Sequence, residues 1–413
     1  MDEYILCFSL FAILLLGYLI LEGIDYGVGM IIPFGSKTDL ERQVLLNTIA
    51  PVWEGHEVWL IVAGAVLFAG FPDIYATLFS GMYLLLFMIL AALILRGLAI
   101  ELRNKDEHKQ WHVFCDWSIC AGSAIPPFFW GMILAGLLNG LPIDASKEYS
   151  GSSIAAINLY TVTVGFLFTL IFLINGMTYL MLRVEQNLTK KIMGTAARCY
   201  SYTIGIQLIF IVLTYTFTQA GEHFLAVVVL ISSAVSLLLG RRLFLQQKYW
   251  LSMAASTFAI LGISGAIFAA MFPIVIVSSV HAGYSLDIYN SAAGAHTLKV
   301  INKAMLIVLP LLIACQFWKA RLFWNRLGTA SLEFEQGKGE LSIKLRETLN
   351  LLSIARALAD TMDKVSQAYR GRDGSVLNQL TTETRDLLCG SSNNKKSKGK
   401  TGKKALASER RNH

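Results

Sequence analysis

The chain has 413 residues, of which 55% are hydrophobic and 15% charged, with a mean hydropathy of +0.55 and a formal net charge of +7. These values exclude a soluble globular protein and are typical of a membrane protein with several spans. Six scattered cysteines without a CxxC pair, and the lack of Walker A, GxGxxG, HExxH and nucleophile-elbow patterns, give no sign of a disulfide framework, a zinc site or soluble-enzyme chemistry.

Long apolar segments predict nine transmembrane helices, since a span needs about 20 apolar residues. They run approximately over residues 4–32, 52–72, 75–101, 114–140, 158–184, 196–219, 222–240, 253–279 and 299–323. The N-terminal MDEY lacks the basic start and cleavage site of a signal peptide, so we expect the first span to remain in the mature protein. We predict an all-α, polytopic membrane domain over residues 1–327, with eight helices arranged as two four-helix bundles and one peripheral helix.

The basic residues of the predicted loops alternate from one loop to the next. Loops after odd-numbered spans hold most of the Lys and Arg, whereas loops after even-numbered spans hold almost none. Because short cytoplasmic loops are enriched in Lys and Arg, we predict a periplasmic N-terminus and a cytoplasmic C-terminus.

Two carboxylates lie in the cytoplasmic half of the first span, in the sequence LEGIDYGVGM. Glu22 and Asp25 are three residues apart and therefore share a helix face. Desolvation and mutual repulsion favour a proton held between them, as a proton relay requires. The alternative is that one carboxyl group is neutral and only hydrogen-bonds a backbone carbonyl. Gly23, Gly27 and Gly29 predict close approach of a neighbouring helix.

The second span opens on WEGHEVW, which places ionisable residues in the first turn of an apolar segment. Ionisable groups at membrane depth are costly and usually mark proton or ion pathways. Glu54 and Glu57 share one helix face between Trp53 and Trp59, so we predict that both acids belong to a proton path and that the two tryptophans support it. The alternative is an interfacial turn whose charges meet water.

Two basic side chains accompany these acids. His56 lies off the acidic face and is a candidate metal or haem ligand, but a hydrogen-bonded structural role is favoured for a lone histidine. Bis-histidine haem ligation needs a second histidine at matching depth, and the sequence offers none. We therefore predict no metal-binding or cofactor-binding residue in this chain. Arg96, inside the third span, is expected to pair with a carboxylate, and snorkelling to the interface is the alternative.

The C-terminal part has a different composition. Residues 328–389 are predicted to be a cytoplasmic segment, in which apolar residues at helical spacing indicate an amphipathic helix near 340–368. Residues 390–413 hold eight basic residues against one acidic residue and are predicted to be a disordered basic tail. Such a tail can bind nucleic acid, but contact with anionic membrane lipid is favoured, and no nucleic-acid partner is expected.

Several ordered motifs resemble subunit II of the cytochrome bd-type quinol oxidases, which include the cyanide-insensitive oxidases. The match extends over residues 5–325. It comprises LEGIDYGVGM, APVWEGHEVWLIVAGAVLFAGFPDIYA, LILRGLAIELR, GLLNGLP, the Phe-Pro pair of the eighth span and SAAGAHTLK. Four or five motifs of this length in the same order are a specific signal, whereas any one alone is weak.

The resemblance implies a respiratory quinol:O2 oxidoreductase of the bacterial inner membrane. In that family a partner, subunit I, binds haems b and d and the quinol, while subunit II supports assembly and a proton path. The family also allows a small single-helix accessory subunit and a structural quinone or lipid. Glu54 stands at the family's proton-path acid, and Glu22 and Asp25 match its acidic pair. Two positions depart from the family pattern: His56 replaces an Asn, and Asn175 replaces a His.

Two other functions remain open from the residues alone. A cation-coupled secondary transporter would use the acidic clusters to bind its coupling ion, and a broken helix or an inverted repeat would favour it. A purely structural membrane subunit would differ from the oxidase subunit only in that its carboxylates carry no protons.

Overall fold

The computed structural model describes residues 2–106, 108–152, 156–218, 223–324 and 326–328. The predicted amphipathic helix near 340–368 and the predicted basic tail at 390–413 lie outside these residues. The described part is almost entirely helical, and its elements are α1 (Glu3–Gly35), α2 (Asp39–Leu46), α3 (Trp53–Gly70), α4 (Pro72–Gly81), α5 (Tyr83–Leu102), η1 (Arg103–Lys105), α6 (Lys109–Asn139), α7 (Leu159–Arg183), α8 (Gln186–Phe217), α9 (Phe224–Leu245), α10 (Tyr249–Met271), β1 (Ile274–Ile276), η3 (Ala282–Tyr284), β2 (Leu286–Asp287) and α11 (Ala295–Leu322).

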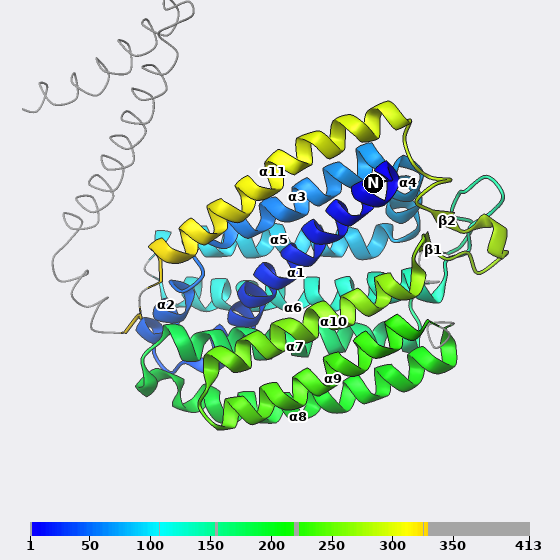
Figure 1. Ribbon diagram of the computed structural model, residues 1–413. Helices are drawn as coiled ribbons and strands as arrows, with labels where there is room; N and C mark the ends of the chain where they lie inside the picture. Colours follow the sequence, from blue (N-terminus) through cyan, green and yellow to red (C-terminus); the bar gives the residue numbers. More distant parts are fainter. Residues whose placement is uncertain (1, 107, 153–155, 219–222, 325, 329–413) are drawn as a thin grey trace, which may run out of the picture. The chain divides into compact units, whose positions relative to one another are not determined.

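Eight helices in the described part are long and apolar enough to cross a membrane, and the number is nine when the bent pair of α3 and α4 is counted as one span. The helices run roughly side by side, with α2 near one end of the domain and the β1–β2 pair near the other (Figure 1). The prediction of an all-α, polytopic membrane protein is therefore confirmed.

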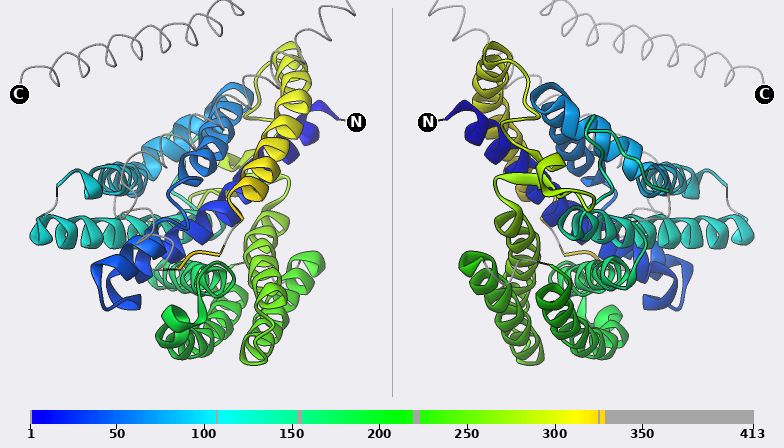
Figure 2. Two further views of the ribbon diagram at one scale, coloured as in Figure 1. Left: turned by 90° about the vertical axis from the view of Figure 1, so that its left-hand side faces the viewer. Right: turned by 90° about the vertical axis from the view of Figure 1, so that its right-hand side faces the viewer.

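The helices form two groups of four. In the first group, α1 packs against α3 and α6, and α6 packs against α5. In the second group, α7 packs against α8 and α10, and α9 packs against α8 and α10. Helix α11 contacts α1 and α3 and lies outside both groups, as the two views of Figure 2 show. This arrangement is the predicted pair of bundles with one peripheral helix.

The two bundles meet where α1 crosses α7, and glycines permit the close approach. A Cβ atom on Gly27 would collide with the backbone of Phe172 and Gly176 on α7. A Cβ atom on Gly29 would collide with Ser123 of α6. Small residues allow helix backbones to come this close in membranes, so the glycines of LEGIDYGVGM have the packing role that the sequence predicts.

Two predicted boundaries are wrong. The third span was expected to begin at residue 75, but residues 72–81 form the separate helix α4, bent by 118° from α3. Phe71 ends α3 in a non-helical conformation, and Pro72 starts α4 at its first turn, the helix position that proline favours. The third span is therefore α5 alone, starting at Tyr83.

The eighth span was expected to reach residue 279, but α10 ends at Met271. Pro273 cannot continue the helix, and the β-branched run that follows it forms strand β1, which pairs antiparallel with β2. Hydropathy alone does not separate a short apolar strand from the end of a helix.

Candidate functional site

A buried ionic cluster links α1, α3 and α5. Arg96 of α5 donates to Glu22 of α1 through Nη1, at 2.7 Å, and to Glu57 of α3 through Nη2, at 3.0 Å. The side chains of Arg96 and Glu22 are fully buried. The guanidinium also lies over the ring of Tyr26, 4.6 Å from its centroid. The predicted pairing of Arg96 with a carboxylate is confirmed, and snorkelling does not describe this buried side chain.

A second pair lies beside the first on the same face of α1. Asp25 Oδ2 and His56 Nδ1 are 2.6 Å apart, and both side chains are buried. His56 is therefore engaged by a carboxylate, in agreement with the hydrogen-bonded role that its sequence context favours. Glu22 and Asp25 share a helix face as predicted, but each has its own basic partner.

The buried carboxylates of Glu22 and Asp25 each have one oxygen that is not engaged by their basic partners. Glu22 Oε1 and Asp25 Oδ1 have no hydrogen-bond partner among the described residues. Buried polar atoms are nearly always satisfied, by protein or by ordered water. Carboxylates and imidazoles are also the usual side chains for proton exchange. The cluster therefore offers two buried acceptors, one turn apart on α1, to a water molecule or a proton.

The remaining predicted residues lie in the first turns of α3. Glu54 is exposed, while Glu57 has a side chain 28% exposed beyond its contact with Arg96. Trp59 is buried against Gly17 of α1, and Trp53 is buried against Gly97 of α5. The two tryptophans thus fix α3 against its neighbours, and the acids on the open side of α3 remain accessible.

A small cavity of about 130 Å³ reaches this cluster from the side of α11. Asp25 and His56 line its inner part, together with Gln316 and Lys319 of α11. Gln316 Nε2 donates to the backbone oxygen of Gly55 at 2.6 Å, and a Cβ atom on Gly55 would collide with Lys319. The start of α3 and the C-terminal part of α11 are therefore in direct contact beside the cavity.

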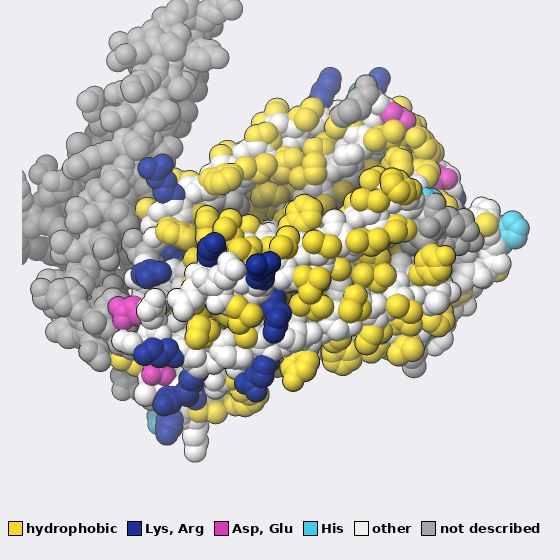
Figure 3. Space-filling view, turned by 60° about the horizontal axis from the view of Figure 1, so that its bottom comes forward, with side chains coloured by type: hydrophobic (Ala, Val, Ile, Leu, Met, Phe, Trp, Pro, Cys, Tyr) yellow, Lys and Arg dark blue, Asp and Glu magenta, His cyan; other side chains and the backbone are white. Residues whose placement is uncertain are grey.

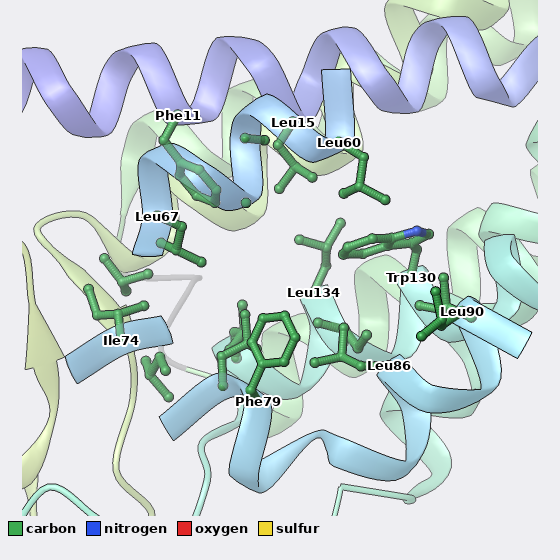
Figure 4. A pocket seen from close by; sticks show the side chains of 18 of the residues that line it. Phe11, Leu15, Leu60, Leu67, Ile74, Phe79, Leu86, Leu90, Trp130 and Leu134 are labelled. Atoms are coloured by element: carbon green, nitrogen blue, oxygen red, sulfur yellow. The ribbon is translucent and has the colours of Figure 1, made fainter. Parts of the chain in front are cut away.

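A larger cavity of about 390 Å³ lies toward the other end of the first bundle. Helices α1, α3, α4, α5 and α6 contribute apolar side chains to it, among them Phe11, Leu67, Phe79 and Trp130 (Figure 4). The Trp130 indole donates to the Tyr18 hydroxyl at 3.3 Å. The lining suits a hydrocarbon chain or a prenyl tail and gives few polar contacts to a head group.

A second ionic network was missed by the sequence analysis. Arg103 donates to Asp116 at 2.7 Å and to Asp39 at 2.6 Å, and Arg42 donates to Asp116 at 3.1 Å. Arg103 and Asp116 are both buried. Asp116 falls inside the predicted fourth span, so the rule that flagged the other intramembrane acids could have found it.

The described histidines do not provide a pair inside the bundles for bis-histidine haem ligation. His56 is the one inside a bundle, and its Nδ1 faces Asp25. His108 and His112 face Asp106 and Asp39, respectively, beyond the end of α5, while His223, His281 and His296 are exposed. Among the described residues no group of three His, Cys, Asp or Glu has the geometry for a metal ion.

Comparisons with known proteins agree with one another. The family model for cytochrome bd terminal oxidase subunit II matches residues 4–323. Cytochrome bd ubiquinol oxidase subunit 2 of Bacillus subtilis (strain 168) is 36% identical over 329 residues, with 78% of this chain and 96% of that protein covered. Cytochrome bd-I ubiquinol oxidase subunit 2 of Escherichia coli (strain K12) is 27% identical over 361 residues, with 78% and 94% covered.

A solved structure shares the fold. The structure of bd oxidase from Geobacillus thermodenitrificans contains a chain that superposes with a TM-score of 0.62 at 17% sequence identity, covering 78% of this chain and 99% of that one. The motifs, the two bundles with a peripheral helix and the matched family model lead to the same assignment: the chain belongs to the cytochrome bd terminal oxidase subunit II family.

Proposed function

We propose that this chain, as subunit II of a bd-type quinol oxidase, supports the assembly of subunit I and conducts protons to it from the cytoplasm. The observation that carries the proposal is the buried cluster around Arg96, in which Glu22 and Asp25 each keep an oxygen without a partner in the described structure. A purely structural ion pair has no need of such spare acceptors, because buried polar atoms are costly when unsatisfied.

Two openings lead to the cluster from one end of the helices. Glu54 lies exposed at the start of α3, one turn before Glu57. The cavity beside Lys319 leads to the pair formed by Asp25 and His56. In the proposed route, Glu54 takes up protons and passes them to Glu57, while the cavity serves an inner branch through Asp25 and Glu22. The two branches meet at Arg96, whose positive charge holds Glu22 and Glu57 in place.

The orientation rests on the distribution of basic side chains. On the face in Figure 3, most Lys and Arg side chains gather toward one end, and apolar side chains cover much of the remainder. Lys319, Arg321 and Arg103 belong to the same end of the helices as Glu54. By the positive-inside rule this end is cytoplasmic and the N-terminus is periplasmic.

The surface for subunit I is the apolar face of α3, α5 and α11. Phe68 is 61% exposed, Phe87 is 51% exposed and Phe317 is 74% exposed. Lipid covers many such faces, but here the accessible acids Glu54 and Glu57 lie on the α3 side of the face. A partner bound to this face would receive protons directly from these acids. It would also separate the two carboxylates from the surrounding lipid. Haems b and d and the quinol site are proposed to lie in that partner, as the resemblance to the bd-type oxidases implies.

The apolar cavity of about 390 Å³ is proposed to hold a structural quinone tail or a lipid chain. Its lining is almost wholly hydrocarbon, which gives affinity through apolar burial and offers no group for redox chemistry. The expected contribution is to the stability of the first bundle. The proposed membrane partners are thus subunit I, lipid and, as the family allows, a small single-helix subunit.

A matched pair of variants tests the proton path in the complete complex. Glu57→Gln removes the ionisable proton but keeps a hydrogen-bond acceptor for Arg96. We expect slower oxygen reduction with full haem content. Glu101→Gln changes an exposed acid at the end of α5 and should leave turnover unchanged. Equal turnover of wild type and Glu57→Gln would favour a purely structural role for this chain.

A transporter is not favoured, although one helix is broken. The bend between α3 and α4 is the feature that would suit a discontinuous transporter helix. It lies far along α3 from Glu54 and Glu57, at Phe71 and Pro72, and the acid beside it, Asp73 of α4, is already paired with Lys147. Family membership identifies an oxidase subunit instead.

A further inference from the structure

Arg183, the last residue of α7, is a buried cation that has no counterion among the described residues. Its side chain belongs to a residue only 3% exposed. Nε and Nη1 are buried and have no hydrogen-bond partner among the described residues, and no ion pair of Arg183 occurs in that part of the chain. A guanidinium has five donors arranged to bind carboxylate or phosphate. Leaving two of its nitrogens unsatisfied is costly, so an acceptor is expected beside them.

The space for that acceptor is built of aromatic rings. Arg183 lines a cavity of about 410 Å³ together with Trp250, Trp324 and Arg326. It also lines the smaller cavity that reaches His56. The guanidinium carbon lies 5.2 Å from the Trp324 ring and 5.7 Å from the Tyr179 ring. These rings hold the guanidinium plane by cation–π contact but leave Nε and Nη1 without an acceptor in the described part of the chain.

The charge around the cavity favours an anion. Arg326 lines the larger space, and Lys319 lines the smaller one. The acid on these walls is Asp25, which His56 already engages. Glu185, two residues further along the chain, is exposed and makes no ion pair with Arg183 in the described structure. The larger space is therefore lined by two arginines and no acid, and the smaller one by Arg183, Lys319 and a carboxylate that is already engaged.

The chain that follows α11 is fastened beside this space. Leu327 N donates to Arg183 O at 2.8 Å, and Glu185 N donates to Leu327 O at 3.1 Å. Arg326 Nε donates to the carbonyl of Leu182 at 3.4 Å. These bonds hold Arg326 at the end of α7, so the second cation of the cavity has a defined position.

We propose that Arg183 and Arg326 bind the phosphate group of an anionic phospholipid, seated between α7, α10 and α11. Trp250 and Trp324 are 59% and 44% exposed and mark a membrane interface, where tryptophan is enriched. Basic pockets between transmembrane helices on the cytoplasmic side bind anionic headgroups. The exposed apolar side chains of α10 and α11 provide the adjoining surface for acyl chains. A soluble phosphate would use the same donors but would gain nothing from that surface.

The test uses the purified complex with subunit I, stripped of lipid while its haem spectrum is retained, and titrated with short-chain phosphatidylglycerol. Bound lipid is counted by native mass spectrometry, and the thermal midpoint is followed. Arg183→Gln should weaken phosphatidylglycerol binding about tenfold, the loss expected for a charged hydrogen bond. Phosphatidylcholine carries the same phosphate beside a cationic choline, so it should bind the wild type more weakly and lose affinity by a smaller factor in this variant. Arg242→Gln, an exposed arginine at the end of α9, is the matched control and should behave as wild type.

Further variants and ligands distinguish an anionic lipid from other molecules that could bind at Arg183. Arg183→Lys should keep more of the phosphatidylglycerol preference than Arg183→Gln, because the charge remains while the fork geometry is lost. Arg326→Gln should weaken phosphatidylglycerol binding by a smaller factor and should leave assembly of the complex intact. It therefore tests the proposal even if Arg183→Gln fails to assemble. Unchanged phosphatidylglycerol binding in both Gln variants, or in Arg326→Gln when only that variant assembles, would overturn the proposal. Equal stabilisation by glycerol 3-phosphate would overturn the assignment to a lipid.

Discussion

His56 on α3 and Asp25 on α1 are joined by a contact of 2.6 Å between Nδ1 and Oδ2, and both are buried. The pair ties the second span to the first at the depth of the Arg96 cluster. An Asn side chain, which the resemblance to the oxidase family suggests for this position, can also donate to a carboxylate.

The first prediction follows from that contact. His56→Asn should keep haem content and oxygen reduction close to wild type, because Asp25 retains a donor. His56→Leu should lower the yield of assembled complex, because a buried carboxylate is left without its partner. Haem content per complex and the thermal midpoint in detergent measure both effects. Equal stability of the Asn and Leu variants would mean that the contact contributes nothing to folding.

The second prediction concerns Arg96. Arg96→Met leaves Glu22 and Glu57 without their shared cation, and breaking a buried ion pair typically costs about 3–5 kcal/mol. The thermal midpoint of the complex should fall sharply. Arg42→Met is the control, since this arginine is partly exposed and its partner Asp116 keeps a bond to Arg103. Its loss should be about 0–1 kcal/mol.

A compensating variant sharpens this test. Replacing both acids together with the arginine, as Arg96→Met with Glu22→Gln and Glu57→Gln, removes the uncompensated charge. Stability should recover at least in part, because neutral replacement of a buried ionic group is often tolerated. A triple variant as unstable as Arg96→Met alone would show that packing, and not charge, explains the loss.

The third prediction tests the crossing of α1 and α7. Gly27→Ala places a methyl group against the backbone of Phe172 and Gly176, and overpacking of this kind typically costs about 1–3 kcal/mol. Gly205→Ala on α8 meets nothing within 4 Å and should be neutral or slightly stabilising, since alanine favours helix. Thermal unfolding of the two variants side by side gives the comparison. A neutral Gly27→Ala would contradict the close packing.

Much of the architecture was predictable from the sequence because it depends on local properties. Span number, the glycine-rich packing face of α1 and the pairing of Arg96 all follow from hydropathy, residue size and the cost of burying a charge. The break at Phe71 and Pro72 was missed because apolar residues continue across it. A Pro at the first turn of a new helix was the available signal.

The partners of the buried charges were not predictable in the same way. The acid that pairs with Arg96, His56 or Arg103 is decided by the rotation of each helix about its axis and by the depth of each helix in the membrane. Spacing within one helix fixes neither quantity. Arg183 was missed for a related reason, since a basic residue at the end of a span normally meets water, and only the packing of α10 and α11 buries it.

The most direct test of the proposed proton path is the rate of proton uptake during oxygen reduction by the complete complex, with Glu54 changed. Glu54→Gln keeps the shape of the side chain but cannot ionise, whereas Glu54→Asp keeps the acid with a shorter reach. Loss of a proton-transfer group typically slows a reaction about 10²-fold or more. With haem content intact, we expect slowed uptake and slowed oxygen reduction for Gln and much of the wild-type rate for Asp. Equal rates for wild type and Glu54→Gln in a fully haem-loaded complex would contradict proton uptake through Glu54 and leave only the branch that starts at the cavity beside Lys319.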